Sequence, residues 1–209
     1  MKPIYFPNVG YIEQKLSKEV MNRLKTYIKN RTKKSNQELA GNIGSSYDLI
    51  DKDNWFFNKV LCPTIIEFDK HFTARQVVPK TLTKNCRFVL NKFWVNFQKR
   101  YEFNPLHHHT GCYSFVIWVT IPSSYNKEKE LPFVKHSNSK SPNSFEFLYT
   151  DALGKVCNHA YRLEPSHEET MLFFASHQNH LVYPHYLSTK NRVSISGNVY
   201  LDPEQTLND

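Results

Sequence analysis

The stretch NPLHHHTGCYSFVIWVTI, residues 104 to 121, places three consecutive histidines immediately before a long run of β-branched and aromatic residues. The apolar run is typical of a strand that is buried on both faces. If the backbone is extended through the histidines, His107 and His109 point the same way with Cα atoms roughly 6.5 Å apart, while His108 points away. Two imidazoles at that separation can share one metal ion. Taken alone, the stretch fits a solvated histidine-rich loop equally well.

A second segment, residues 171 to 201, contains two strand-like runs joined by a histidine-rich connection. Polar and apolar residues alternate in its second run, which predicts a strand with one polar face; the polar positions are Arg192, Ser194, Ser196 and Asn198. The simplest interpretation is a strand that exposes this face to water. An arginine beside serines also suits a cavity that receives a carboxylate, because arginine supplies a planar fork of donors and a hydroxyl adds another.

Together these residues resemble the 2-oxoglutarate-Fe(II) oxygenase family, distant relatives of the prolyl hydroxylases. The resemblance rests on a His-x-His pair before a strand, a distal histidine after LFFAS, and an Arg-x-Ser twelve residues beyond that histidine. It extends over WVNFQKRYEFNPLHHHTGCYSFVIWVTIP, FEFLYTDALGK and FFASHQNHLVYPHYLSTKNRVSISGN, so that it covers roughly residues 90 to 200. It implies a mainly β fold, a double-stranded β-helix or jelly roll, with N-terminal α-helices packed on one face.

The resemblance also implies a ligand set. Fe(II) would be held by His107, His109 and His180, and Arg192 would bind the distal carboxylate of the cosubstrate 2-oxoglutarate with the assistance of Ser194.

Two asparagines are further candidates for cofactor binding. Asn96 stands in a Trp-x-Asn that faces the active site in the family, although a strand residue facing water explains it equally well. Asn198 lies on the polar face of the last strand.

Position 109 departs from the family, which usually has a carboxylate there, so it stays open whether His109 or His108 is the middle ligand. Three imidazoles leave as many metal positions free as a two-histidine, one-carboxylate triad does. Because three histidines also hold catalytic zinc in other proteins, the ligand list does not name the metal. Arg192 favours the oxygenase, since a hydrolytic zinc site has no evident need for a buried arginine one strand away.

The implied function is an Fe(II)- and 2-oxoglutarate-dependent dioxygenase. It would use O2 to hydroxylate a C–H bond of an unidentified substrate, a peptide or protein with proline as the family default, and would release succinate and CO2.

Two alternatives stay open. The net charge of +8 and the basic run 29–34 suggest a nucleic-acid demethylase of the same fold. Nucleic acid is not favoured as a partner, because the second arginine of those enzymes corresponds to Asn198. The other alternative is a cupin-like module without enzymatic activity, in which the histidines hold a structural zinc.

The 209 residues suit a single domain, 1–209, with helical support over 1–80 and a jelly-roll core over 86–201. We see no apolar run typical of a signal peptide or a membrane span, and expect no membrane partner. The four cysteines lack paired spacing, which predicts free thiols in a reducing cytoplasm. The family resemblance adds the expectation that this cytoplasm is that of a bacterial host infected by a phage.

Apolar residues at four-residue intervals predict an amphipathic helix over 12–29. A second helix is predicted from Asp53 through Phe68 with Asp51 or Asp53 as its cap, either kinked at Pro63 or split into two. Strands are predicted over 86–102, 112–121, 145–150, 156–163, 171–175 and 192–199. Residues 122–144 are predicted to form a polar loop, and the tail from residue 202 is predicted to fray.

Overall fold

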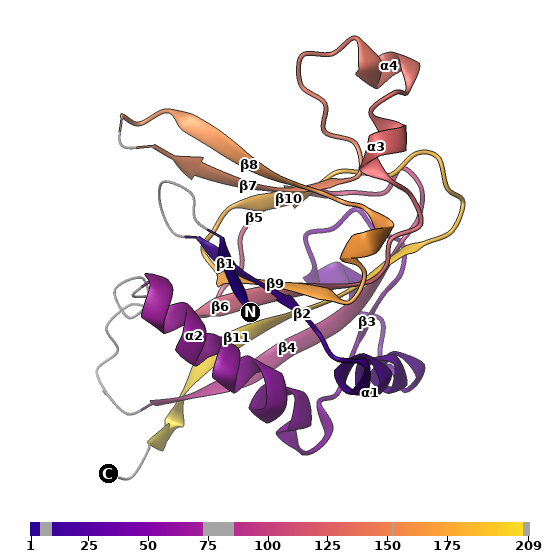
Figure 1. The fold of residues 1–209 in the computed structure, drawn as a ribbon. Helices are drawn as coiled ribbons and strands as arrows, with labels where there is room; N and C mark the ends of the chain where they lie inside the picture. Colours follow the sequence, from indigo (N-terminus) through magenta and orange to yellow (C-terminus); the bar gives the residue numbers. More distant parts are fainter. Residues whose placement is uncertain (5–9, 73–85, 152, 207–209) are drawn as a thin grey trace.

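The structure, a computed structural model, describes residues 1–4, 10–72, 86–151 and 153–206, whose strands form two antiparallel sheets (Figure 1). The larger sheet has the strand order β1 (Lys2–Ile4), β2 (Tyr11–Lys15), β9 (Thr170–Ala175), β6 (Tyr113–Thr120), β11 (Arg192–Thr206), β4 (Cys86–Gln98) and β3 (Ser46–Asp48). The smaller sheet has the order β5 (Asn104–His107), β10 (His180–Val182), β7 (Ser144–Thr150) and β8 (Val156–Arg162). This part of the chain is mainly β, as predicted.

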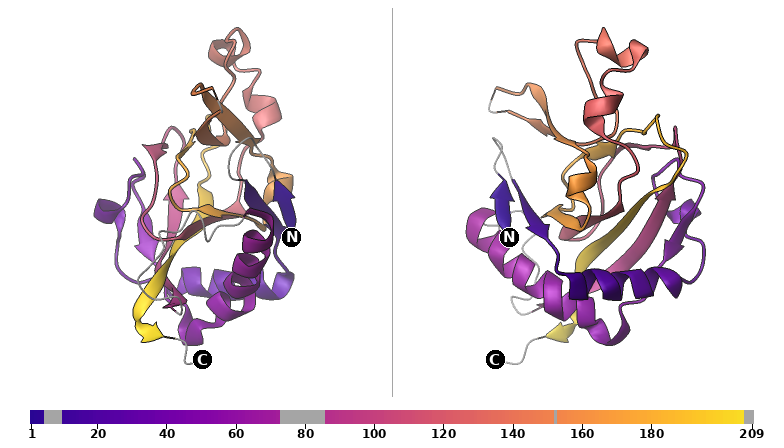
Figure 2. Two further views of the ribbon diagram at one scale, coloured as in Figure 1. Left: turned by 90° about the vertical axis from the view of Figure 1, so that its left-hand side faces the viewer. Right: turned by 45° about the vertical axis from the view of Figure 1, so that its right-hand side comes forward.

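Strand β6 buries both of its faces, which confirms the prediction for the apolar run after the histidines. Phe115 and Ile117 belong to the core cluster on one side of the larger sheet, which also contains residues of the helices. Val116 and Trp118 belong to a second cluster, which they share with Phe145 and other residues of the smaller sheet. The larger sheet is therefore covered on one face by helices and on the other by the smaller sheet (Figure 2).

The first predicted helix begins later than its periodicity suggested. Residues 11–15 form strand β2, which pairs with β1 and β9, and helix α1 covers Lys18–Lys29. Ser17 starts the helix, since its side chain accepts a hydrogen bond from the backbone N–H of Val20. The prediction of helix over residues 12–17 was wrong, because pairing with β9 gives Ile12 and its neighbours a buried, hydrogen-bonded place in the sheet.

The second predicted helix is divided, as its internal proline indicated. A 3-10 turn, Lys52–Asn54, and a π-helical turn, Phe57–Leu61, precede α2 (Cys62–Phe72). The carboxylate of Asp51 accepts hydrogen bonds from the backbone N–H groups of Phe56 and Phe57, each at 2.8 Å, which confirms an aspartate cap. Pro63 follows the π-helical turn closely, as the second residue of α2, and its missing N–H leaves a gap in the helical hydrogen bonds where the turn joins α2.

The segment predicted as a polar loop between β6 and β7 contains two single-turn helices, α3 (Tyr125–Glu128) and α4 (Pro132–Lys135). Short 3-10 turns also form at Asn36–Glu38 and Pro165–His167. The side chain of Glu128 is fully buried and accepts hydrogen bonds from the backbone N–H groups of Tyr186 and Leu187. These bonds attach the segment between β6 and β7 to the connection between β10 and β11. The polar composition of the segment does not reveal that it is held in this way.

The remaining strand predictions agree with the structure to within a residue or two, except at two places. Strand β4 ends at Gln98, so the prediction of strand over residues 99–102 was wrong, because these residues form a turn in which Tyr101 has a φ of 72°. Strand β11 continues past residue 202 to Thr206, which pairs with Cys86 of β4, so the predicted fraying at residues 202–206 was wrong. Residues 207–209 lie outside the described residues. The four cysteines are free thiols, as predicted. No helix in the described ranges is long and apolar enough to cross a membrane.

Gly197 of β11 is a sensitive point of the larger sheet. A Cβ atom at this position would lie 2.6 Å from Cζ of Phe115 and 2.8 Å from the carbonyl oxygen of Lys92, both inside van der Waals contact. We expect Gly197→Ala to lower the free energy of unfolding by about 1–3 kcal/mol, because β4 and β6 flank the strand and backbone cannot move aside. Chemical denaturation measures the loss.

The matched control is Gly154→Ala in the β7–β8 turn, where a Cβ meets nothing within 4 Å and only the positive φ of 83° opposes substitution. Gly154→Ala should lower the free energy of unfolding by about 1 kcal/mol. An unchanged stability in Gly197→Ala would contradict the crowding at this position.

Candidate metal centre and adjoining pocket

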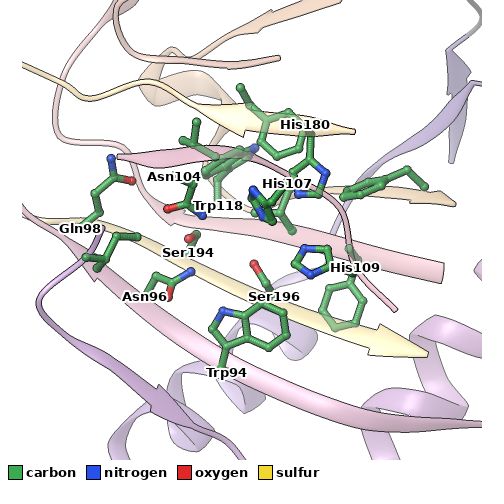
Figure 3. A pocket seen from close by; sticks show the side chains of 16 residues that line it. Trp94, Asn96, Gln98, Asn104, His107, His109, Trp118, His180, Ser194 and Ser196 are labelled. Atoms are coloured by element: carbon green, nitrogen blue, oxygen red, sulfur yellow. The ribbon is translucent and has the colours of Figure 1, made fainter. Parts of the chain in front are cut away.

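A pocket that is partly open to solvent lies between the two sheets (Figure 3). Strands β4, β6, β9 and β11 of the larger sheet contribute one wall, and β5, β7 and β10 of the smaller sheet contribute the other. Its lining residues are Ile43, Trp94, Asn96, Gln98, Asn104, His107, His109, Phe115, Val116, Trp118, Phe145, Phe174, His180, Val182, Ser194 and Ser196. None of these carries a carboxylate, an ammonium or a guanidinium group.

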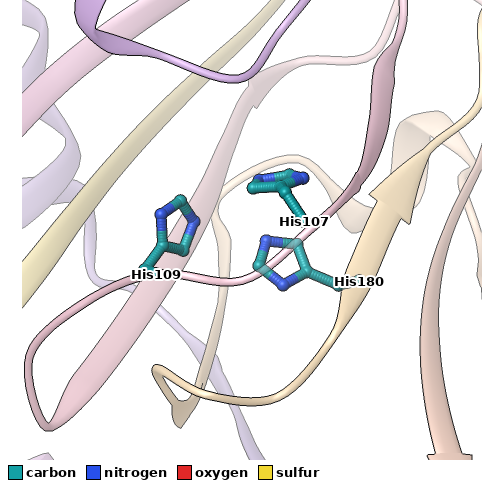
Figure 4. A group of neighbouring side chains, drawn as sticks. All are labelled: His107, His109 and His180. Carbon is teal, nitrogen blue, oxygen red and sulfur yellow. The ribbon is translucent and has the colours of Figure 1, made fainter.

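Three histidines converge at one end of this pocket (Figure 4). His107 at the end of β5 pairs in register with His180 at the start of β10, and His109 follows in the loop after β5. The backbone N–H of His109 donates to the carbonyl oxygen of Ser176 at 2.9 Å, which holds that loop against the end of β9. One ligand nitrogen from each ring lies within 4.8 Å of the other two. His108 is exposed and does not belong to this group.

Hydrogen bonds orient two of the three rings. Nδ1 of His107 lies 2.7 Å from the carbonyl oxygen of Pro105, and Nδ1 of His180 lies 2.8 Å from that of Gln178. A carbonyl oxygen only accepts, so each Nδ1 carries the proton and each Nε2 keeps its lone pair. Metal-bound histidines commonly have this backbone partner on the nitrogen that faces away from the ion.

Burial keeps these rings neutral. It lowers the pKa of His109 to about 3, with His107 and His108 adding smaller charge repulsion in the same direction. Burial also lowers the pKa of His107 and takes that of His180 well below 6.5. Without an ion the site therefore disfavours protonated imidazole at neutral pH, so the lone pairs that a metal needs are available.

The arrangement fits a metal ion with open coordination positions. Neighbouring ligands with bonds of about 2.1 Å lie about 3 Å apart around an octahedral ion, so the three nitrogens, which lie within 4.8 Å of one another, would be drawn together around it. A closed structural zinc site needs a fourth protein ligand. Among the described residues the group contains three histidines and no fourth ligand, so exogenous molecules have room to bind.

Polar side chains extend the pocket away from the histidines. Asn96 and Gln98 share one face of β4, and Ser194 and Ser196 share one face of β11, where Ser194 pairs in register with Asn96. The structure therefore brings two predicted cofactor residues, Asn96 and Ser194, into the same pocket as the histidines. Asn198, another predicted cofactor residue, is not part of the lining; its side-chain oxygen accepts a hydrogen bond from the hydroxyl of Ser114 at 2.8 Å.

Arg192 is almost completely buried, with 1% of its surface exposed, and does not line the pocket. Its Nε donates to Oε1 of Gln98 at 3.1 Å, Nη1 donates to Oδ1 of Asn143 at 3.0 Å, and Nη2 donates to the carbonyl oxygen of Tyr183. Burial lowers the pKa of Arg192 to about 9 against the opposing effect of Glu128, so the guanidinium remains charged at pH 7. The predicted anchor thus lies behind Gln98.

Sequence reasoning missed several lining residues. Gln98 and Trp94 could have been found, because they share the alternating face of β4 with Asn96. Trp118 carried no signal within its apolar run. Two lining residues hold buried polar atoms without a hydrogen-bond partner in the described structure: Nε1 of Trp118 and Oδ1 of Asn104.

Protein-family models give no match to this chain, and a search of curated proteins finds no relative. Solved structures do share its fold. One is a crystal structure from Burkholderia pseudomallei of an oxidoreductase of the 2OG-Fe(II) oxygenase family, 10% identical, with a TM-score of 0.51 over 92% of this chain and 86% of that one. Another is a viral collagen prolyl hydroxylase from Paramecium bursaria Chlorella virus-1 in complex with 2OG, 9% identical, with a TM-score of 0.51 over 90% of this chain and 94% of that one. The chain therefore has the fold of these 2OG-Fe(II) oxygenases.

Proposed function

We propose that this protein is an Fe(II)- and 2-oxoglutarate-dependent dioxygenase that hydroxylates a C–H bond of a peptide or protein. The single observation that carries the proposal is the group of His107, His109 and His180, whose ligand nitrogens lie within 4.8 Å of one another at the end of a pocket. The shared fold with two 2OG-Fe(II) oxygenases supports it. The double-stranded β-helix predicted from the sequence is part of the same proposal.

Each wall of the pocket has a part in this function. The imidazoles of His107, His109 and His180 would hold the iron, and three protein ligands would leave room for cosubstrate and O2. Fe(II), 2-oxoglutarate and O2 together supply the oxidising power, and succinate and CO2 are the co-products. Apolar side chains, Phe145, Phe174 and Val116 among them, keep water away from the reacting atoms. The amides and hydroxyls at the other end receive the distal carboxylate.

A row of three aromatic rings, of which the two outer ones are exposed, supports a polypeptide substrate. Phe133 of α4 contacts Tyr186 with ring centroids 5.1 Å apart, and Tyr186 contacts Tyr101 at 5.8 Å. Phe133 and Tyr101 are 65% and 58% exposed. Tyr186 and Tyr101 lie a few residues from the pocket residues Val182 and Asn104 in sequence. Such rings offer the apolar contacts with which proteins commonly bind extended peptides. The viral neighbour is a collagen prolyl hydroxylase, which makes a prolyl residue the first candidate.

The basic stretch that suggested nucleic acid has a structural explanation in part. The guanidinium of Arg31 lies over the rings of Tyr47 and Phe97, at 5.0 and 5.4 Å from their centroids. Nucleic acid is therefore not the substrate we propose. The zinc module is disfavoured by the open coordination described above.

The proposed function predicts a visible charge-transfer band. Under anaerobic conditions the protein is reconstituted with Fe(II), and 2-oxoglutarate is then added. Chelation of the iron through the keto and carboxylate oxygens should produce the band, because three iron positions are free. Zn(II) in place of Fe(II) serves as the colourless control. An iron-loaded protein that gives no band would contradict the dioxygenase and make the zinc or cupin-like module the better interpretation.

A further inference from the structure

We propose, on the basis of the function above, that Tyr101, Tyr186 and Phe133 form a docking surface for an acidic, extended segment of the substrate polypeptide. We call these three residues the aromatic row. The row lies at the end of β5 and β10 that is away from the histidines, since Tyr101 precedes β5 and Tyr186 follows β10. Strand β5 spans about 10 Å between its two ends. The row therefore contacts residues of the polypeptide that flank the reacting residue.

Backbone hydrogen bonds hold together the three segments that carry the row. The N–H of Tyr101 donates to the carbonyl oxygen of His185 at 3.2 Å. The buried carboxylate of Glu128 accepts from the N–H groups of Tyr186 and Leu187 at 2.9 and 3.1 Å. This joins the segment that contains α4, which stands out from the body of the fold, to the same connection (Figure 1). The rings are thus fixed before a ligand arrives, which lowers the entropic cost of binding.

Tyr101 occupies a backbone conformation that glycine would adopt more easily. Its φ is 72°, in the left-handed region where a Cβ crowds the backbone. The side chain is 58% exposed, so burial in the core does not compensate for this strain. An exposed aromatic ring at a strained position points to a contact with another molecule.

Positive charge surrounds the row. Within four residues of the three rings along the chain there are two anions, Glu102 and Glu130, and five cations: Lys99, Arg100, Lys129, Lys135 and Lys190. Glu102 accepts hydrogen bonds from two backbone N–H groups, and Glu130 pairs with Lys135 at 3.5 Å. Lys99, Arg100 and Lys190 form no ion pair with another described residue. The surface therefore attracts carboxylates.

The orientation of the rings favours polypeptide over nucleic acid. The planes of Phe133 and Tyr186 meet at 79° and those of Tyr186 and Tyr101 at 55°, so the rings do not present parallel faces. The guanidinium of Arg100 covers one face of Tyr101, 4.7 Å from the ring centroid. Nucleic-acid bases bind by stacking on open ring faces. Proline rings and other apolar side chains fit between tilted aromatic rings, which suits an acidic polypeptide that also contains such residues.

The test measures the binding of three capped octapeptides by isothermal calorimetry. The protein is loaded with Zn(II), on which no oxidation proceeds. The probes are (Glu-Pro)4, (Ser-Pro)4 and (Lys-Pro)4; proline keeps each extended, so that they differ mainly in charge. We expect (Glu-Pro)4 to bind at least about tenfold more tightly than (Ser-Pro)4, and (Lys-Pro)4 to show no measurable binding. The preference should decrease as salt is added, because exposed charges are screened.

Two variants test the rings. Phe133→Ser and Tyr101→Gly should each raise the Kd of (Glu-Pro)4 about tenfold, the effect of truncating an aromatic anchor. Tyr101→Gly should retain or raise the Tm, because glycine adopts a φ of 72° without strain, so weaker binding would not reflect unfolding. Leu153→Ser is the matched control. Its side chain is 94% exposed in the β7–β8 turn, outside the row, and the Kd should stay unchanged.

A double variant tests the charge separately. Lys99→Gln with Lys190→Gln removes two cations and leaves the rings in place. It should lower the ratio of the Kd of (Ser-Pro)4 to that of (Glu-Pro)4 about fivefold, while the Kd of (Ser-Pro)4 itself stays unchanged. Lys18→Gln with Lys25→Gln, at exposed positions of α1, removes the same charge elsewhere and should leave the ratio unchanged.

Three results would overturn the inference. One is equal affinity for (Glu-Pro)4 and (Ser-Pro)4, or an unchanged Kd in both ring variants. Another is tighter binding of octathymidylate that weakens in the ring variants, because the surface would then bind nucleic acid. The third is a wild-type dimer in sedimentation experiments that the ring variants dissociate, which would assign the row to an interface between copies of this chain.

The dioxygenase is tested separately by the charge-transfer band described above. A band without a preference for the acidic peptide would refute the docking surface alone. A peptide preference without a band would refute the dioxygenase, and the row would then bind a partner rather than a substrate.

Discussion

Replacing His180 with phenylalanine is expected to abolish metal binding while the fold persists. His180 is 3% exposed, and its ring packs among aromatic rings, stacked on Phe145 at a centroid distance of 5.2 Å and also close to Phe174 and Phe147. A phenyl ring suits these neighbours, so little packing is lost. The ligand nitrogen disappears, however, and the two remaining histidines cannot hold the ion in the same geometry.

We expect the affinity for Fe(II) to fall by more than about 100-fold, beyond the effect of losing a residue that only supports a ligand. The measurement is metal content after dialysis, together with the rise in Tm on adding metal, which should vanish in the variant because binding no longer stabilises the native state. The Tm of the metal-free protein should be retained or raised, since the buried imidazole is replaced by an apolar ring.

His108→Phe is the matched control. Its side chain is exposed and lies outside the group of converging nitrogens, so full metal binding should remain. Metal retained at full occupancy in His180→Phe, or lost in His108→Phe, would mean that the ion is held by other residues than those assigned.

The second large effect is expected in the core, where Phe68 attaches α2 to the larger sheet. Its ring is fully buried and lies 5.6 Å from Tyr113 of β6 and 5.7 Å from Phe173 of β9, measured between ring centroids. Phe68→Ala would leave a cavity that β6 and β9, each paired on both sides, cannot fill. We expect a loss of about 3–5 kcal/mol in the free energy of unfolding.

Ile66→Ala on the same helix controls for helix propensity and for the loss of apolar volume. Ile66 is 59% exposed, and its truncation should change stability by no more than about 0.5 kcal/mol. Urea titration of both variants measures the difference. Equal, small losses would show that α2 does not depend on Phe68 for its attachment.

Local periodicity was sufficient for much of the site. A strand places every second side chain on one face whatever surrounds it, so periodicity alone assigns Ser194 with Ser196 to a common face. His109 lies in the loop after β5, where its backbone N–H bonds to the carbonyl oxygen of Ser176. The unbroken apolar run of β6 likewise indicated burial on both faces. The start of α1 shows the limit: the same spacing of Ile12 and Leu16 fits a helix, and only pairing with β9 made residues 11–15 a strand.

The amino-acid sequence by itself indicated which residues are candidates for the chemistry: His107, His109, His180, Asn96, Ser194 and Arg192. The tertiary structure alone decided what each polar atom faces. Arg192 meets Asn143 and Gln98, 49 and 94 residues away in the chain, and Trp118 is left with an unpaired N–H in the pocket among the described residues. Periodicity describes how a side chain points from its own backbone. A hydrogen-bond partner depends on which distant strand the fold brings alongside, and that is a property of the two sheets together.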